Sequence, residues 1–105
     1  MRPLLLLPTL VLACACGSGT PRPAGASAQS TGKVIFNAQC AMCHGQQGDL
    51  GVNGAKDLRK STLGREEVIA VVTNGRNAMM PYKSILSPEQ VEDVADHVLT
   101  LRTKP

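Results

Sequence analysis

The five residues from Cys40 to His44 constrain this chain more than any other part of it. They read Cys-Ala-Met-Cys-His, the C-x-x-C-H pattern of covalent haem attachment. Two thiols three residues apart can each form a thioether with one of the two vinyl groups of a haem. His44, directly after Cys43, then lies under the ring and can bind the iron. The motif predicts haem c attached to Cys40 and Cys43, with His44 as the proximal iron ligand.

Other kinds of site also use a C-x-x-C pair, and each requires further features elsewhere in the chain. A thioredoxin-like dithiol expects a βαβ setting, and the sequence has no alternating strand pattern. A zinc site needs further ligands, and His97 is the only other histidine. A disulfide between Cys40 and Cys43 beside an incidental histidine stays open as a non-haem, structural alternative.

The composition of the chain favours a large buried cofactor. Its 105 residues include one Phe, one Tyr and no Trp, and a single small domain of this kind has only a marginal core. A porphyrin would supply the flat apolar body that the side chains lack. Lys and Arg total 11 against 8 Asp and Glu, a net charge of +3, and no basic stripe suggests nucleic acid.

The first residues are typical of an export signal. Residues 1–16 combine Arg2 with an apolar run that is too short for a bilayer span, which takes about 20 residues. Cleavage at the small-x-small site that ends at Ala28 would release a free protein. Lipidation of Cys14, in a lipobox-like Val-Leu-Ala-Cys string, would instead anchor the protein to a membrane, with residues 17–31 as a flexible tether. Both routes stay open, and both predict an exported protein.

Residues 32–105 form the predicted domain, and their apolar spacing indicates an all-α fold of about three main helices. The first helix covers about residues 32–40. The second covers about residues 63–73, with two glutamates in its first turn, where the helix dipole favours negative charge. Gly75 suits the left-handed position that commonly follows a helix. A glycine-rich loop separates the first two helices.

The third helix carries the clearest signals. Ser87 as the N-cap, Pro88 at the first position and Gln90 at the third form a capping box. Apolar residues then recur along one face: Val91, Val94, Ala95, Val98 and Leu99. Acidic residues are expected on the solvent face: Glu92, Asp93 and Asp96.

The loop between the second and third helices contains two adjacent methionines, Met79 and Met80, followed by Pro81 and Tyr82. A thioether is a soft, neutral ligand that favours reduced iron. A methionine from this loop would therefore raise the reduction potential and fill the coordination sphere, which suits electron transfer rather than oxygen chemistry. The plainer interpretation is that both methionines fill the core.

Residues 32–101 resemble a class I cytochrome c. Residues 32–40 are similar to the N-terminal helix that leads into the haem cysteines of that family, while residues 72–79 and 86–95 are similar to its photosynthetic c6 branch. The resemblance implies an all-α domain wrapped around one covalent haem. It also implies a monomeric one-electron carrier, not an enzyme, that serves larger photosynthetic or respiratory complexes in the periplasm or thylakoid lumen.

The resemblance extends to single residues. The two cysteines and the histidine of the motif match the thioether positions and the proximal ligand of the family. Relatives with Met directly before Pro would assign the distal ligand to Met80, whereas counting from Gly75 assigns it to Met79, which we favour. A haem-based sensor or peroxidase-like domain, in which the methionine leaves the iron, stays open as a second function.

One departure from the family concerns the proximal histidine. The family often has a proline after the haem motif whose carbonyl accepts the N–H of the proximal imidazole. No proline occurs between His44 and Met80. A carbonyl near Gly54 or Ala55 is expected to replace it, because this bond orients the ring and sets its basicity.

Two further expectations concern His97, through the resemblance, and the propionates of the predicted haem. His97 stands where the family has an aromatic residue on the last helix, and it is expected to pack on Phe36 or Gly32 with one ring nitrogen in water. The haem propionates need partners or water, and four basic side chains are candidates: Lys56, Arg59, Lys60 and Arg76.

Overall fold

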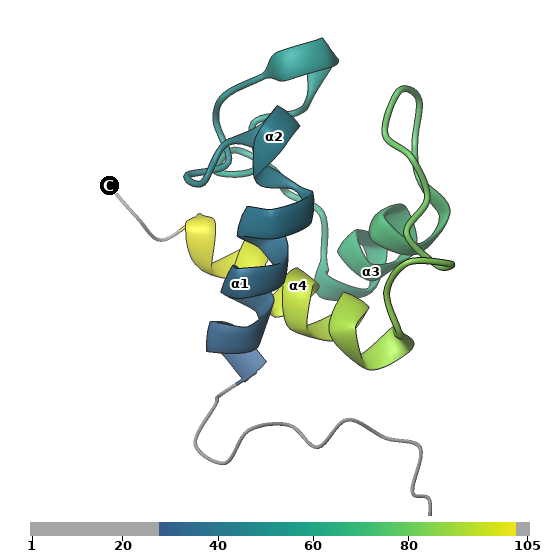
Figure 1. Ribbon diagram of the computed structural model, residues 1–105. Coiled ribbons are helices and arrows are strands. Elements are labelled where there is room, and N and C mark those ends of the chain that lie inside the picture. The colour runs from purple at the N-terminus through teal and green to yellow at the C-terminus, as the bar shows by residue number, and fades with distance from the viewer. Residues whose placement is uncertain (1–27, 103–105) are drawn as a thin grey trace, which may run out of the picture.

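The structure, a computed structural model, describes residues 28–102. Within this range the chain forms α1 (Ala28–Gln39), α2 (Ala41–His44), the 3-10 turn η1 (Val52–Gly54), α3 (Arg65–Asn74) and α4 (Pro88–Leu101). Residues 28–102 contain no strand, only an isolated bridge between Arg76 and Met79. The predicted all-α class is confirmed (Figure 1).

The three long helices lie close to their predicted positions, and the short α2 and η1 were not predicted. α1 begins at Ala28, so residues 28–31 are helical, although they were assigned to the flexible tether. The predicted signal, including Cys14, lies outside the described residues. None of the described helices is long and apolar enough to cross a bilayer.

The core forms where α1 packs against α4, with α3 added on one side (Figure 1). Phe36 is 1% exposed, and Val94 and Leu101 are completely buried. Burying a side chain such as Phe36 stabilises the fold by about 1.5–3 kcal/mol. Gly32 permits the close approach of the two helices, because a Cβ at this position would overlap the main-chain carbonyl of Asp93.

Because α1 and α4 approach so closely, one expectation about the solvent face of α4 is wrong. Asp93 was expected on the solvent face with Glu92 and Asp96, but it is only 5% exposed. Since Gly32 has no side chain, the backbone of α1 lies directly on the turn that carries Asp93 and covers it. Glu92 is exposed and Asp96 is half-buried, as their side of the helix predicts.

His97 packs on α1 as expected. Its ring centroid lies 5.1 Å from that of Phe36, with the ring planes tilted by 55°. An offset, tilted pair of this kind is a favourable arrangement of aromatic rings. His97 is 4% exposed and its Nε2 is buried, so the ring has less contact with water than expected.

The ends of α3 and α4 follow from local hydrogen bonding. The Oγ of Ser87 accepts the amide of Gln90 at 3.2 Å, and the Ser87 amide donates to the Gln90 side chain at 2.8 Å, which confirms the predicted capping box. At the start of α3 the Gly64 amide donates to the carboxylate of Glu67 at 2.8 Å. Gly75 ends α3 with φ 74° but ψ 169°, so it takes the positive φ expected and not the left-handed helical conformation.

Candidate functional site

Cys40 lies at the break between α1 and α2. It has φ −111° and ψ −31°, and its amide still donates to the carbonyl of Phe36 at 2.8 Å. The side chain is 8% exposed. Burial raises the pKa of the Cys40 thiol to about 11, so the thiol is neutral at physiological pH and a weak nucleophile before it is modified.

α2 brings the second cysteine and the histidine to the same turn. The amides of Cys43 and His44 both donate to the carbonyl of Cys40, at 3.3 and 3.0 Å. Residues three apart on a helical turn lie on one face, so Cys40 and Cys43 can react with the same planar group. Both are free thiols in the structure, without a disulfide between them.

The ring of His44 is oriented by a main-chain carbonyl. Its Nδ1 lies 3.1 Å from the carbonyl oxygen of Lys56. A carbonyl can only accept, so Nδ1 carries the proton and Nε2 keeps its lone pair for a metal. The acceptor was expected near Gly54 or Ala55 and lies just beyond them, because the 3-10 turn η1 ends at Gly54 and Ala55 continues in an extended conformation with ψ 132°.

The loop that carries the methionines is closed at its base. The amides of Tyr82 and Lys83 donate to the carbonyls of Val72 and Thr73 on α3, at 3.0 and 3.2 Å. α2 and this loop lie at the same end of the molecule (Figure 1). The loop therefore holds its methionines at the end of the fold where α2 holds the cysteines and the histidine.

Within this loop the two methionines differ in burial. Met79 makes two main-chain hydrogen bonds with Arg76, of 2.9 and 3.0 Å, which form a tight turn. Its side chain is partly buried and packs against the core. Met80 is 52% exposed.

Tyr82, which the sequence did not single out, connects the methionine loop to the end of α1. Its hydroxyl donates to the carbonyl oxygen of Gln39 at 3.0 Å, next to Cys40. Burial raises the pKa of Tyr82, with smaller contributions from Cys40 and Cys43. The hydroxyl thus stays protonated and available as a donor. The one sequence signal was the position of the only tyrosine in the chain, directly after Pro81.

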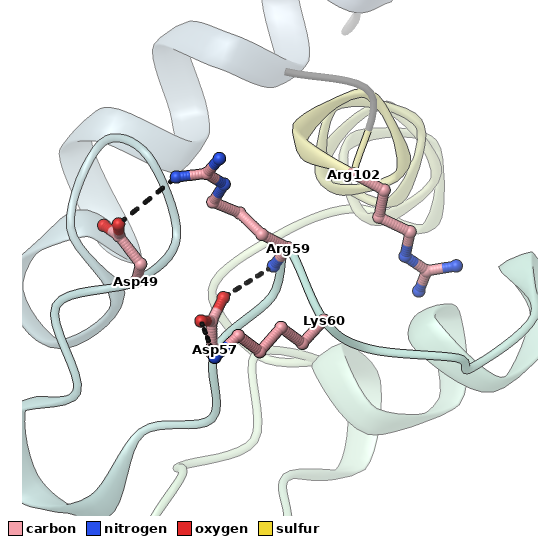
Figure 2. Close-up of a pocket in the computed structure, with 5 residues that line it drawn as sticks. All are labelled: Asp49, Asp57, Arg59, Lys60 and Arg102. Carbon is pink, nitrogen blue, oxygen red and sulfur yellow. Dashed lines mark hydrogen bonds and ion pairs between the residues drawn. The ribbon is translucent and has the colours of Figure 1, made fainter. Parts of the chain in front are cut away.

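The basic candidates for the haem propionates are divided between two settings. Lys56 and Arg76 are exposed. Arg59 and Lys60 line a cavity of about 430 Å³, together with three further charged side chains (Figure 2): Asp49, Asp57 and Arg102. Arg59 lies 3.5 Å from Asp49, and Lys60 lies 3.9 Å from Asp57. These two cations therefore already have carboxylate partners, and none of the five predicted haem-site residues lines their cavity.

The arrangement fits covalent haem better than zinc. Over residues 28–102, no group of three or more His, Cys, Asp or Glu side chains is placed to hold a metal ion. A zinc site around Cys40 and Cys43 would need such a group. A haem needs only the two thiols and one oriented imidazole from the protein on its proximal side, and the structure provides these.

Comparison with known proteins identifies the family. Residues 27–98 match the family described as cytochrome c oxidase, cbb3-type, subunit III. Cytochrome c6 of Nostoc sp. strain PCC 7120 is 46% identical over 83 residues, which cover 73% of this chain and 74% of that protein. The chain belongs to the class I c-type cytochromes, in the c6 family. Cytochrome c6 of Leptolyngbya boryana is 46% identical over 80 residues, 70% of this chain and 92% of that protein. Cytochrome c6 of Rippkaea orientalis is 40% identical over 105 residues, which cover 94% of this chain and 93% of that protein.

Membership of this family decides between the alternatives for the C-x-x-C-H motif. The cofactor of this c-type cytochrome is one covalently bound haem c, and the protein is an electron carrier and not an enzyme. The disulfide-stapled, non-haem alternative is therefore wrong.

Proposed function

We propose that this c-type cytochrome passes single electrons between larger redox complexes, with its haem iron held between His44 and Met79. The observation that carries the proposal is the contact of 3.1 Å between His44 Nδ1 and the Lys56 carbonyl. It leaves Nε2 as the ligand atom and gives the imidazole a fixed orientation and a higher basicity.

The protein supplies fixed ligands, and the haem, when bound, supplies an iron that alternates between two oxidation states. Thioethers at Cys40 and Cys43 hold the ring in place through every cycle. The donor bond to the Lys56 carbonyl keeps His44 in one tautomer. Because neither ligand has to move or exchange a proton, little reorganisation accompanies each electron.

Met79 is the better candidate for the distal ligand. It is partly buried against the core, and its main chain is held by the turn with Arg76. Met80 is 52% exposed and has fewer constraints. A neutral thioether ligand favours the reduced iron and raises the potential, which suits a carrier that accepts electrons readily.

The partners that we infer are a donor and an acceptor complex of a photosynthetic or respiratory chain. Contacts of this kind are small and short-lived, at the low end of interface sizes. We infer a monomer that works outside the cytoplasm, in the periplasm or the thylakoid lumen. Mass spectrometry of the mature protein tests export, because cleavage after Ala28 and lipidation of Cys14 each give the chain a different mass. The same measurement reports the mass of the haem.

The decisive experiment compares Met79→Ala with Met80→Ala. We expect Met79→Ala to abolish the weak Met–iron absorption band at the red end of the spectrum. We also expect it to lower the potential by roughly 0.1 V or more, within the range of about 0.8 V that axial ligands span. Met80→Ala, the matched control, should keep both properties.

The outcomes separate the possible ligand sets. The reverse result would assign the distal position to Met80. An unchanged spectrum in both variants would rule out His/Met ligation. Rapid carbon monoxide binding by the reduced wild-type protein at neutral pH would instead favour a haem-based sensor with an open iron site.

A further inference from the structure

The hydroxyl of Tyr82 makes a long-range hydrogen bond in the described part of the chain. It donates to the carbonyl of Gln39 at 3.0 Å, across 43 residues of sequence. The Tyr82 side chain is 8% exposed. A buried hydroxyl needs a partner, because burying it without one costs free energy. Its bond to Gln39 is therefore a constraint on where the methionine loop can lie.

The Gln39 carbonyl needs this donor because α1 ends there. In an uninterrupted helix it would accept the amide of Cys43, four residues on. That amide donates to the carbonyl of Cys40 at 3.3 Å instead, since the chain breaks at Cys40 and starts the new turn α2. The last carbonyls of a helix must find other partners. Tyr82 supplies one of them from the loop between α3 and α4.

The backbone of Tyr82 is held as firmly as its side chain. Its amide donates to Val72 on α3, and its carbonyl accepts the amides of Ile85 and Leu86 at 2.9 and 2.8 Å. The residue thus connects α3, the approach to α4 and the end of α1. Met79 and Met80 precede it in the chain, with only Pro81 between Met80 and Tyr82.

We propose that Tyr82 is a positioning residue whose hydroxyl ties the methionine loop to the end of α1 beside Cys40 and so keeps the loop closed over the haem. The inference rests on the proposed function, in which a methionine of this loop binds the iron. For that methionine to leave the iron, the loop has to swing outward, and the bond between Tyr82 and Gln39 opposes that movement. The hydroxyl acts through the loop, because the partner to which it donates is the main-chain carbonyl of Gln39.

Tyr82→Phe tests the proposal, because it removes the hydroxyl and keeps the buried ring. A neutral hydrogen bond of this type changes an opening equilibrium by roughly two- to tenfold. A ligand that binds only the open form gains apparent affinity by the same factor. We expect the reduced Tyr82→Phe protein to bind carbon monoxide two- to tenfold more tightly than the wild type. Amide hydrogen exchange at Met79 should accelerate by a similar factor.

Thr100→Val is the matched control. The Thr100 hydroxyl also donates to a main-chain carbonyl, that of His97 at 2.6 Å, but near the end of α4. This variant should lower global stability without changing carbon monoxide affinity or exchange at Met79.

The results distinguish the proposal from the function on which it rests. If the wild type lacks the Met–iron band, the ligand assignment fails. If the wild type has the band and Tyr82→Phe matches it in both carbon monoxide affinity and Met79 exchange, Tyr82 is not a positioning residue. Equal changes in Tyr82→Phe and Thr100→Val would also overturn the proposal, since both would then reflect only lost stability.

Discussion

Gly75 shows, at the scale of a single residue, how the methionine loop depends on a missing side chain. Its φ is 74°, which L side chains rarely adopt. A Cβ here would lie 2.6 Å from the carbonyl oxygen of Met79 and 2.8 Å from the nitrogen of Pro81. The returning segment of the loop therefore passes directly over this residue.

Gly75→Ala should destabilise the protein by about 2–6 kcal/mol, the sum of about 1–3 kcal/mol for a backbone conformation that is essentially restricted to glycine and about 1–3 kcal/mol for the overlap with the loop. Gly54→Ala is the matched control, because Gly54 also has a positive φ, 75°, but has nothing within 4 Å of the added carbon. It should cost only about 1–2 kcal/mol. Urea unfolding measures both values. Equal losses in the two variants would show that the overlap at Gly75 is relieved without cost.

At the scale of elements, the crossing of α1 and α4 determines the core. Gly32 allows the two backbones to approach, while Phe36 and His97 fill the crossing one turn further along. The same crossing buries Asp93 on a helix whose spacing placed it in water. The sequence of one helix therefore does not decide which of its faces another helix covers.

Gly32→Ala should lower the stability of the protein, whereas a glycine-to-alanine change in a helix usually raises it. In an exposed helix the change stabilises by about 1 kcal/mol. Here the added carbon would overlap the Asp93 carbonyl, and forcing extra atoms into a packed contact costs about 1–3 kcal/mol. Chemical denaturation should show a net loss of stability, whereas the neighbouring exposed Lys33→Ala should stay within about 0.5 kcal/mol of the wild type. A more stable Gly32→Ala protein would contradict this packing.

At the scale of the whole molecule, we expect the fold to depend on its cofactor. The buried apolar side chains of residues 28–102 are mostly aliphatic, with Phe36 and Tyr82 as the aromatic members. A domain this small has little stability to spare. A haem attached between α2 and the methionine loop would add a large apolar surface where these segments meet. Its binding free energy then contributes to folding.

The double variant Cys40→Ser and Cys43→Ser prevents haem attachment and should lose its cooperative thermal transition and much of its helical circular dichroism. Met42→Ser is the control, because Met42 lies between the two cysteines but is 83% exposed. It should bind haem and unfold like the wild type. A colourless double variant with an unchanged transition would show that the chain folds without its haem.

The sequence alone determined the features that depend on neighbours within one or two turns. The haem motif is five consecutive residues, and the capping box of α4 spans Ser87 to Gln90. The three long helices were predicted because their apolar spacing and end signals are local. The expectation of a carbonyl near Ala55 was also close, since Lys56 is the next residue.

Only the tertiary structure decided the contacts between distant segments. Three observations depend on residues that are far apart in the chain. They are the burial of Asp93, the hydrogen bond between His44 and Lys56, and the hydrogen bond from Tyr82 to Gln39. Hydrogen bonds within a turn depend on spacing along the chain, which a sequence displays directly. Long-range contacts depend on how helices cross and where loops return, and these follow from the packing of all the elements together.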